Sequence, residues 1–158
     1  MNKILNKFIE ENRNNIILCG ESCIGKSHFA GHNLNNQKVI YGLFGRDHDT
    51  GMKKAIEKGK KIIILGAPYF IWRERVKERR KNCPAKSIDH LDRLIKFDRF
   101  EHVARFKENY VRYIKKLRYL GYRYILVACM NDNKDNRNDY PILDESNFLT
   151  MLQQIGEK

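Results

Sequence analysis

The chain has 158 residues, 42% hydrophobic and 11% aromatic, which allows one hydrophobic core and excludes a disordered chain. Its 31 basic residues outnumber 19 acidic ones, for a formal net charge of +12, and no apolar run approaches the roughly 18 residues that span a bilayer. Residues 1–5 have no sustained apolar stretch and no cleavage site, so we expect no secretory signal, a cytoplasmic protein and no membrane partner. We expect one domain over residues 1–158, with a core at about 14–130, an arginine-rich lid at about 69–99 and a C-terminal tail at 131–158.

The first half of the chain predicts two strands and three helices. Apolar residues recur at helical spacing in residues 1–13 and predict an amphipathic helix. A continuous apolar run at 15–19 predicts a buried strand, and the chain continues as a helix at 28–32. Residues 38–43 predict a second strand, and residues 52–58 a helix that ends at a glycine C-cap.

The second half continues the alternation. Residues 62–65 are the strongest strand signal in the chain, and a helix at 69–82 follows them. Apolar spacings of three and four predict one or two helices at 87–120. Residues 122–128 predict the last strand, and residues 148–155 a terminal helix. Apolar strands that alternate with helices imply an α/β fold with a mostly parallel sheet of four to five strands, covered by helices on both faces.

A phosphate-binding loop follows the first predicted strand. The pattern G-x-x-x-x-G-K-[S/T] needs glycines so that successive N–H groups point inward, a helix whose positive end follows, and a lysine that reaches the outer phosphates. Lys26 is this lysine, and the hydroxyl of Ser27 would coordinate Mg²⁺. The strand before the loop and the helix after it favour binding of ATP or GTP over a fortuitous glycine turn. The loop consists of Gly20, Glu21, Ser22, Cys23, Ile24, Gly25, Lys26 and Ser27.

A second acidic motif is missing from its usual place. ATPases and GTPases of this kind hold Mg²⁺ with the help of an aspartate at the end of an apolar strand. Here the strand at 62–65 is followed by Gly66 and the last strand by Cys129, and the base-recognition pattern N-K-x-D is absent from the sequence. Motor ATPases and GTPase switches are therefore disfavoured. The remaining acids are Asp47 and Asp49, of which we favour Asp47.

Basic residues are concentrated in the middle of the chain. Residues 70–123 hold 17 basic and 7 acidic side chains, whereas residues from 131 onward hold 3 and 6. Solvated helix faces explain many of these charges but not their one-sided balance. The middle of the chain therefore predicts a surface that attracts either the phosphates of a nucleotide or a nucleic-acid backbone.

Arginines cluster on the helix predicted at 69–82. Phosphoryl transfer spreads negative charge over the phosphate oxygens, and guanidinium groups suit that geometry. A solvated basic helix would explain the charges alone, but a position directly behind a sheet strand favours a functional role. The arginines are Arg73, Arg75, Arg79 and Arg80.

Residues 65–80 resemble the P-loop nucleoside and nucleotide kinases, above all the thymidylate kinase and deoxynucleoside kinase group. Those enzymes have a strand, a proline, a helix and an R-x-x-x-R pattern that leads to an arginine-bearing lid, and Arg75 and Arg79 stand in the matching places. The helix at 99–110 is similar to the one that they place before their last strand. Their strand ending in Asp-Arg-aromatic is not matched, because Asp98-Arg99-Phe100 lies within helical periodicity.

The resemblance implies a three-layer P-loop kinase-like fold, with ATP and Mg²⁺ as ligands and a phosphate-bearing nucleotide as acceptor. It implies that Lys26 stabilises the transferring group and that Arg75 and Arg79 close over the phosphates. Gly45-Arg46-Asp47 is similar to the family's substrate loop. The implied catalytic residues are Lys26, Arg75, Arg79 and Asp47. The implied substrate-binding residues are Arg46, Asp47, Arg73 and Arg80.

Three functions fit these observations. We favour a kinase that moves the γ-phosphoryl of ATP to a (deoxy)nucleoside monophosphate. A polynucleotide or DNA-base kinase is the second, because the +12 charge exceeds what a mononucleotide requires. The third is a nucleotide-sensing or nucleic-acid-binding module without catalysis, consistent with the missing strand-end acid.

Three further features of the sequence are its cysteines, its many asparagines and the tyrosines at 110–119. The cysteines Cys19, Cys23, Cys83 and Cys129 lack a paired metal-ligand spacing, which favours reduced thiols. Fifteen asparagines and many lysines and isoleucines are typical of A·T-rich genomes, so we expect a phage or viral origin. Finally, three tyrosines alternate with basic residues at 110–119, and we favour core packing with a solvated face over a nucleic-acid surface there.

Overall fold

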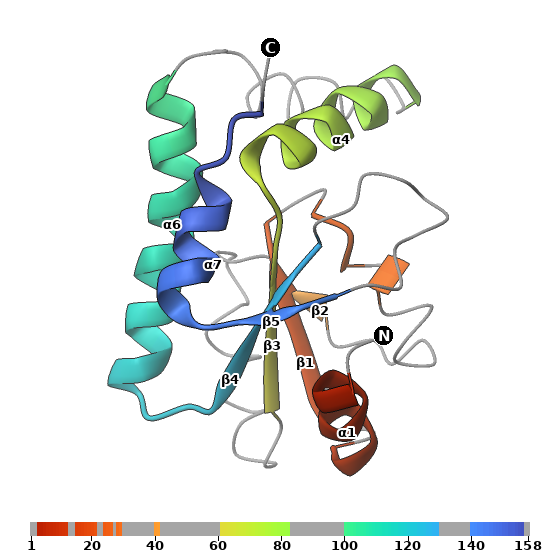
Figure 1. The fold of residues 1–158 in the computed structure, drawn as a ribbon, viewed down its shortest axis with the longest axis vertical. Coiled ribbons are helices and arrows are strands. Elements are labelled where there is room, and N and C mark those ends of the chain that lie inside the picture. The colour runs from red at the N-terminus through yellow and green to blue at the C-terminus, as the bar shows by residue number, and fades with distance from the viewer. Residues whose placement is uncertain are drawn as a thin grey trace.

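A computed structural model shows an α/β fold built around one sheet (Figure 1). It describes residues 3–12, 15–21, 24–26, 28–29, 40–41, 61–82, 100–129 and 140–156. The helices in this part of the chain are α1 (Lys3–Glu11), α4 (Tyr69–Asn82), α6 (Phe100–Tyr119) and α7 (Glu145–Leu152). The strands are β1 (Ile16–Gly20), β2 (Ile40–Tyr41), β3 (Lys61–Gly66), β4 (Tyr124–Ala128) and β5 (Ile142–Leu143). None of the described helices is long and apolar enough to cross a membrane.

The five strands lie in the order β2-β1-β3-β4-β5. The first four are parallel, and β5 is antiparallel to β4. Gly20 is in register with Leu65, and Gly66 with Ala128, so the carboxyl ends of β1, β3 and β4 are level at one edge of the sheet. The prediction of a mostly parallel sheet of four to five strands is confirmed.

The two central strands are apolar because both of their faces are covered. Every residue of β1 is buried, as is every residue of β3 after Lys61. β-Branched isoleucines occupy two of the five positions of β1 and three of the six of β3, and they suit the pleated, buried surface. In Figure 1, α6 and α7 lie together on one side of these strands, and α1, which buries Leu5 and Ile9, lies on the other.

Aromatic rings join three helices beside the sheet. Trp72 of α4 stacks on Phe106 of α6 with ring centroids 4.7 Å apart, and Tyr69 packs against the same ring at 5.7 Å. Tyr110 contacts Phe106 on one side and Phe148 of α7 on the other. Such pairs contribute about 0.5–1.5 kcal/mol each beyond the area they bury. This cluster fixes α4 and α6 relative to each other.

The C-terminal region departs from the prediction. Helix α7 starts three residues earlier than expected, because Asp144 caps it by accepting a hydrogen bond from the backbone N–H of Asn147 at 2.8 Å. The residues before it form β5, so β4 is not the last strand. A two-residue strand is too short to show periodicity in a sequence. Residues 140–156 thus add a strand and a helix to the core.

Some predicted elements lie outside the described residues. They are the predicted helix at 52–58 and the first part of the helical region at 87–120. Phe100 begins α6, so the last residue of Asp98-Arg99-Phe100 is helical and not at a strand end. Lys26, His28 and Phe29 have helical backbone, as expected directly after the phosphate loop.

Candidate functional site

The phosphate loop begins where β1 ends, at a position that only glycine fits. A side-chain carbon on Gly20 would lie 2.8 Å from Ile24 Cγ2 and 2.8 Å from the carbonyl oxygen of Leu65. Gly25 has φ 110°, in the left-handed region that glycine adopts without strain. The two glycines of the pattern therefore do different jobs, the first allowing close packing of the loop on β3 and the second allowing its turn into the helix.

Lys26 lies over the start of the loop. A hydrogen bond from the backbone N–H of Phe29 to the carbonyl of Gly25, 3.0 Å long, closes the first helical turn around it. Its Nζ donates to the carbonyl oxygens of Gly20 at 2.6 Å and of Glu21 at 3.0 Å. The ammonium group and the helix N-terminus therefore meet at the loop, an arrangement that favours an anion.

Arg75 brings a second cation to the loop from α4. Its Nη1 donates to the carbonyl oxygen of Ile24 at 2.7 Å and lies 3.6 Å from the point where a side chain on Gly25 would begin. Its Nε is buried. Trp72 and Val76, on either side in sequence, are buried in the core and set the orientation of this part of α4.

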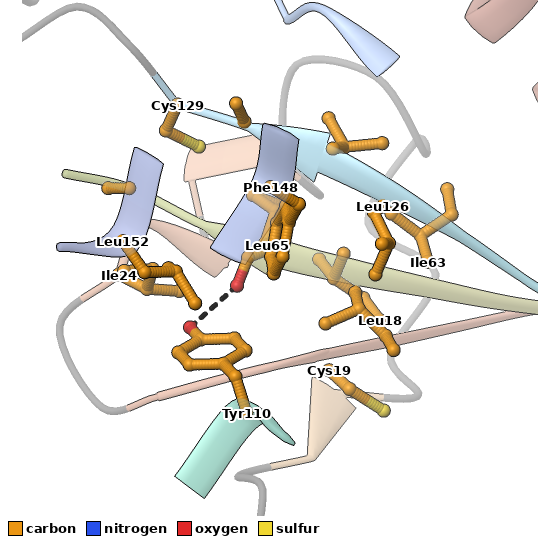
Figure 2. Packing of buried hydrophobic residues seen from close by; sticks show 14 of the residues in the cluster. Leu18, Cys19, Ile24, Ile63, Leu65, Tyr110, Leu126, Cys129, Phe148 and Leu152 are labelled. Atoms are coloured by element: carbon orange, nitrogen blue, oxygen red, sulfur yellow. Dashed lines mark hydrogen bonds between the residues drawn. The ribbon is translucent and has the colours of Figure 1, made fainter. Parts of the chain in front are cut away.

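Helix α6 holds the loop from another direction, with two neighbouring residues. The Tyr110 hydroxyl accepts a hydrogen bond from the backbone N–H of Glu21 at 3.1 Å and donates one to the carbonyl oxygen of Leu65 at 2.7 Å (Figure 2). The amide of Asn109 donates to Glu21 Oε2 at 3.1 Å. Burial raises the pKa of Tyr110 well above its usual value, so the hydroxyl stays protonated and able to donate.

The sequence did not reveal these two contacts. Helical spacing predicts that Tyr110 packs in the core, which its zero exposure confirms, but nothing local marks its hydroxyl as a partner of the loop. Helical spacing shows that a residue faces the core. It does not show which backbone groups, 45 and 89 positions away, its polar end will meet.

Removal of the Tyr110 hydroxyl should lower the free energy of unfolding more than removal of the Tyr113 hydroxyl, one turn later in α6. Tyr110→Phe leaves a loop N–H and a strand carbonyl without their partner, and each such loss costs about 1–3 kcal/mol. Tyr113→Phe is the matched control, because its hydroxyl donates to the weakly accepting sulfur of Cys19, 3.1 Å away. Urea unfolding should show the larger loss for Tyr110→Phe. Equal losses would mean that the Tyr110 hydroxyl does not anchor the loop.

Cys19, the residue before the loop, is a buried thiol. Burial raises its pKa to about 12, and the Tyr113 hydroxyl and nearby Lys26 only partly offset this effect. The thiolate is the reactive form, so at pH 8 on the order of one thiol in 10⁴ is ionised. We expect Cys19 to resist iodoacetamide in the native protein, to react faster as the pH rises toward 12, and to react readily in urea. Peptide mass spectrometry measures this, and equal labelling in both states would contradict it.

The carboxyl end of β3 has no room for an acid. A side-chain carbon on Gly66 would lie 2.5 Å from Cζ of Phe148 and 3.0 Å from Cδ2 of Leu152, both buried in α7. The missing strand-end aspartate thus has a packing reason, since α7 fills the space that a side chain would need.

Gly66→Ala should therefore destabilise the fold, by about 1–3 kcal/mol, as overpacked core substitutions do. Combining it with Phe148→Leu should cost less than the sum of the two single changes, because the smaller side chain makes room for the added methyl group. Thermal or urea unfolding of the three variants measures this coupling. Strict additivity would show that Phe148 does not occupy that space.

The other predicted residues divide into two groups. Arg79 is exposed on α4 one turn after Arg75, and Arg73 is half-buried on the same helix. The remaining candidates lie outside the residues that the structure describes, or have their side chains there. They are Ser22, Cys23, Ser27, Arg46, Asp47, Asp49 and Arg80. Within the described part of the chain, no group of three or more His, Cys, Asp or Glu side chains could hold a metal ion.

The end of β2 lies beside the start of the phosphate loop. Tyr41, the end of β2, is in parallel register with Cys19, one residue before the phosphate loop. Parallel strands have their carboxyl ends at the same edge, so the chain leaves β2 beside the start of that loop.

The loop lies at the place where open α/β sheets bind ligands. In a sheet of order 2-1-3-4-5, that place is outside the carboxyl ends of the strands, between the first and third strands. Gly20 and Leu65 are in register at this point, and Lys26, Arg75 and Tyr110 reach it from three helical segments. Comparison of the chain with protein-family models, with curated proteins and with solved structures finds no match.

Proposed function

We propose that the chain is a P-loop kinase of three-layer fold that transfers the γ-phosphoryl group of ATP to a (deoxy)nucleoside monophosphate. The observation that carries this proposal is the meeting of two cations, Lys26 and Arg75, on the backbone of one glycine-containing loop. A loop that only bound phosphate would need the lysine and the helix N-terminus alone. Charge that spreads over the oxygens of a migrating phosphoryl group is stabilised by additional cations.

Each side chain has a role that follows from its position. Lys26, at the first turn of the helix, neutralises charge on the outer phosphates. Arg75 fixes the loop through Ile24, and the same Nη1 lies beside Gly25. Arg79, one turn further along α4 and exposed, is placed to close over a bound nucleotide, with Arg73 and Arg80 as further contacts to the substrate.

The loop also suits Mg²⁺ with a triphosphate. Gly20 lets the loop pack closely on β3, and Gly25 lets the backbone turn into the helix. This course of the backbone would let its N–H groups approach phosphate oxygens closely. Ser27 would supply a hydroxyl ligand to the ion, which when bound neutralises charge on the β- and γ-phosphates. Since Phe148 excludes an acid at Gly66, we assign the assisting carboxylate to Asp47, beyond β2, with Arg46 at the acceptor.

One experiment separates the three candidate functions. The full chain is incubated with Mg²⁺ and ATP carrying a labelled γ-phosphate, together with nucleosides, nucleoside monophosphates or single- and double-stranded oligonucleotides in turn. Label on a nucleoside monophosphate is the expected result. Label on an oligonucleotide instead would indicate a polynucleotide or DNA-base kinase. ATP binding without transfer to any acceptor would indicate the third candidate, a nucleotide-sensing module without catalysis.

A further inference from the structure

Helix α6 has two faces of opposite character. Its inward face is buried and includes Val103, Phe106, Tyr110, Tyr113, Ile114 and Leu117. Its outward face, which we call the α6 stripe, consists of Arg105, Glu108, Arg112, Lys115, Lys116 and Tyr119, all of them exposed. At 100° per residue the stripe occupies an arc of about 100°, and at 1.5 Å per residue it is about 21 Å long.

The charge of the stripe is one-sided. It holds four basic side chains and one acidic one, and Arg123, just beyond the helix, is exposed as well. Glu108 stands four residues before Arg112, a spacing that allows one i,i+4 pair, and the stripe keeps a surplus of three positive charges. Arg118 lies outside the stripe, where it pairs with Glu145 of α7 and is hydrogen-bonded to the side chain of Tyr124. The stripe is therefore an anion-attracting strip along one helix.

An exposed aromatic ring completes it. Tyr119 is 90% exposed, whereas Tyr110 and Tyr113 on the same helix are completely buried. The expectation of core packing is thus confirmed for the two buried tyrosines and does not describe the third. Leu120, next to it, is 46% exposed. A ring that stands in water among lysines and arginines offers a face on which a nucleic-acid base can stack.

We propose that the α6 stripe binds single-stranded nucleic acid. The basic side chains would track the phosphate backbone, and Tyr119 would stack on an unpaired base, the combination that non-specific single-strand binders use. About 21 Å corresponds to on the order of six phosphates at the 3.4 Å spacing of a stacked strand. At 100° per residue, Asn109, through which α6 contacts the loop, lies about 20° beyond the edge of the stripe at Lys116. None of the stripe residues has a role in the proposed kinase site, so the proposal does not depend on the kinase activity.

The test compares two variants that lose the same charge. Arg112→Ala/Lys115→Ala/Lys116→Ala removes three positive charges from the stripe. Lys3→Ala/Lys7→Ala/Lys81→Ala removes three from exposed positions on α1 and α4, so both variants have the same net charge. Binding of a fluorescent 15-nucleotide oligo(dT) to the full chain is measured by anisotropy between about 50 and 200 mM salt, where phosphate contacts change affinity most clearly.

We expect the stripe variant to bind more weakly and to lower the slope of log affinity against log salt by about two, since each phosphate contact on a single strand contributes about 0.7. The control variant should keep the wild-type slope. Tyr119→Ala should weaken binding by roughly 5- to 150-fold, the value of about 1–3 kcal/mol of stacking, without changing the slope, and Tyr119→Phe should bind like the wild type.

Three results would overturn the proposal. Equal weakening in both triple variants would show that only overall charge matters. Tighter binding to a duplex of the same length, with no effect of Tyr119→Ala, would exclude single-strand recognition. No oligonucleotide binding at 50 mM salt would exclude a nucleic-acid surface. In each case the nucleoside monophosphate assay described above can still succeed, so the two proposals fail separately.

Discussion

Lys26→Ala is expected to lower the rate of phosphoryl transfer by at least about 100-fold, the usual cost of removing one group that stabilises charge in a transition state. The ammonium group sits at the first turn of the helix that follows the loop, within hydrogen-bonding distance of two loop carbonyls. Single-turnover transfer from labelled ATP to the best acceptor measures the effect.

The control for this change is Lys7→Ala, which removes an exposed lysine that makes only a helical ion pair with Glu11. It should leave transfer unchanged. Far-ultraviolet circular dichroism and the thermal midpoint of Lys26→Ala should stay near those of the wild type, since Lys26 lies outside the hydrophobic core. Undiminished phosphoryl transfer by a folded Lys26→Ala protein would contradict the proposed function.

Arg75→Ala is expected to reduce kcat/KM by about 100-fold, for two reasons that act together. It removes a cation that we propose lies beside the transferring group, and it releases the carbonyl of Ile24, so the loop loses one of its fixed points. Arg75→Lys should restore only a small part of the lost kcat/KM, because an ammonium group is a point charge on a flexible stem and lacks the planar guanidinium fork that fixes the direction of its donors.

Two other variants on α4 serve as comparisons for Arg75→Ala. Lys81→Ala, an exposed change on the same helix, should behave like the wild type. Arg79→Ala tests closure over the nucleotide: a loss of kcat with little change in ATP affinity would fit that role. If Arg75→Ala lost stability but kept kcat, the guanidinium would serve only to pack α4 on the loop, and its catalytic assignment would be wrong.

Those parts of the fold that depend on local pattern were predictable. Isoleucine-rich runs with turn residues after them predicted β1 and β3 within one residue of each end, and glycine at position 121, φ 75°, ended α6 as expected. The close packing at Gly20 and the left-handed turn at Gly25, φ 110°, are the parts of the loop that the sequence pattern requires and the structure shows, whereas its binding of phosphate stays a prediction.

Features that depend on contacts between distant residues were not predictable. The Tyr110 hydroxyl joins the loop to β3, and the ring of Phe148 fills the end of β3 at Gly66. Sequence showed Gly66 only as a missing acid. The structure shows a position where α7 leaves no room for one. Similarly, helical spacing did not distinguish the tyrosines of α6, whereas the structure buries Tyr110 and Tyr113 and leaves Tyr119 exposed.

Nuclear magnetic resonance of the isotopically labelled chain, titrated with ATP and Mg²⁺, tests most directly whether the loop binds a nucleoside triphosphate. Saturable shifts of the backbone amides of Glu21, Gly25 and Lys26, with little change at Asn147 in α7, are the predicted result, and they should be lost in Lys26→Ala. Shifts confined to other regions, or none at millimolar ATP, would contradict the assignment of this loop.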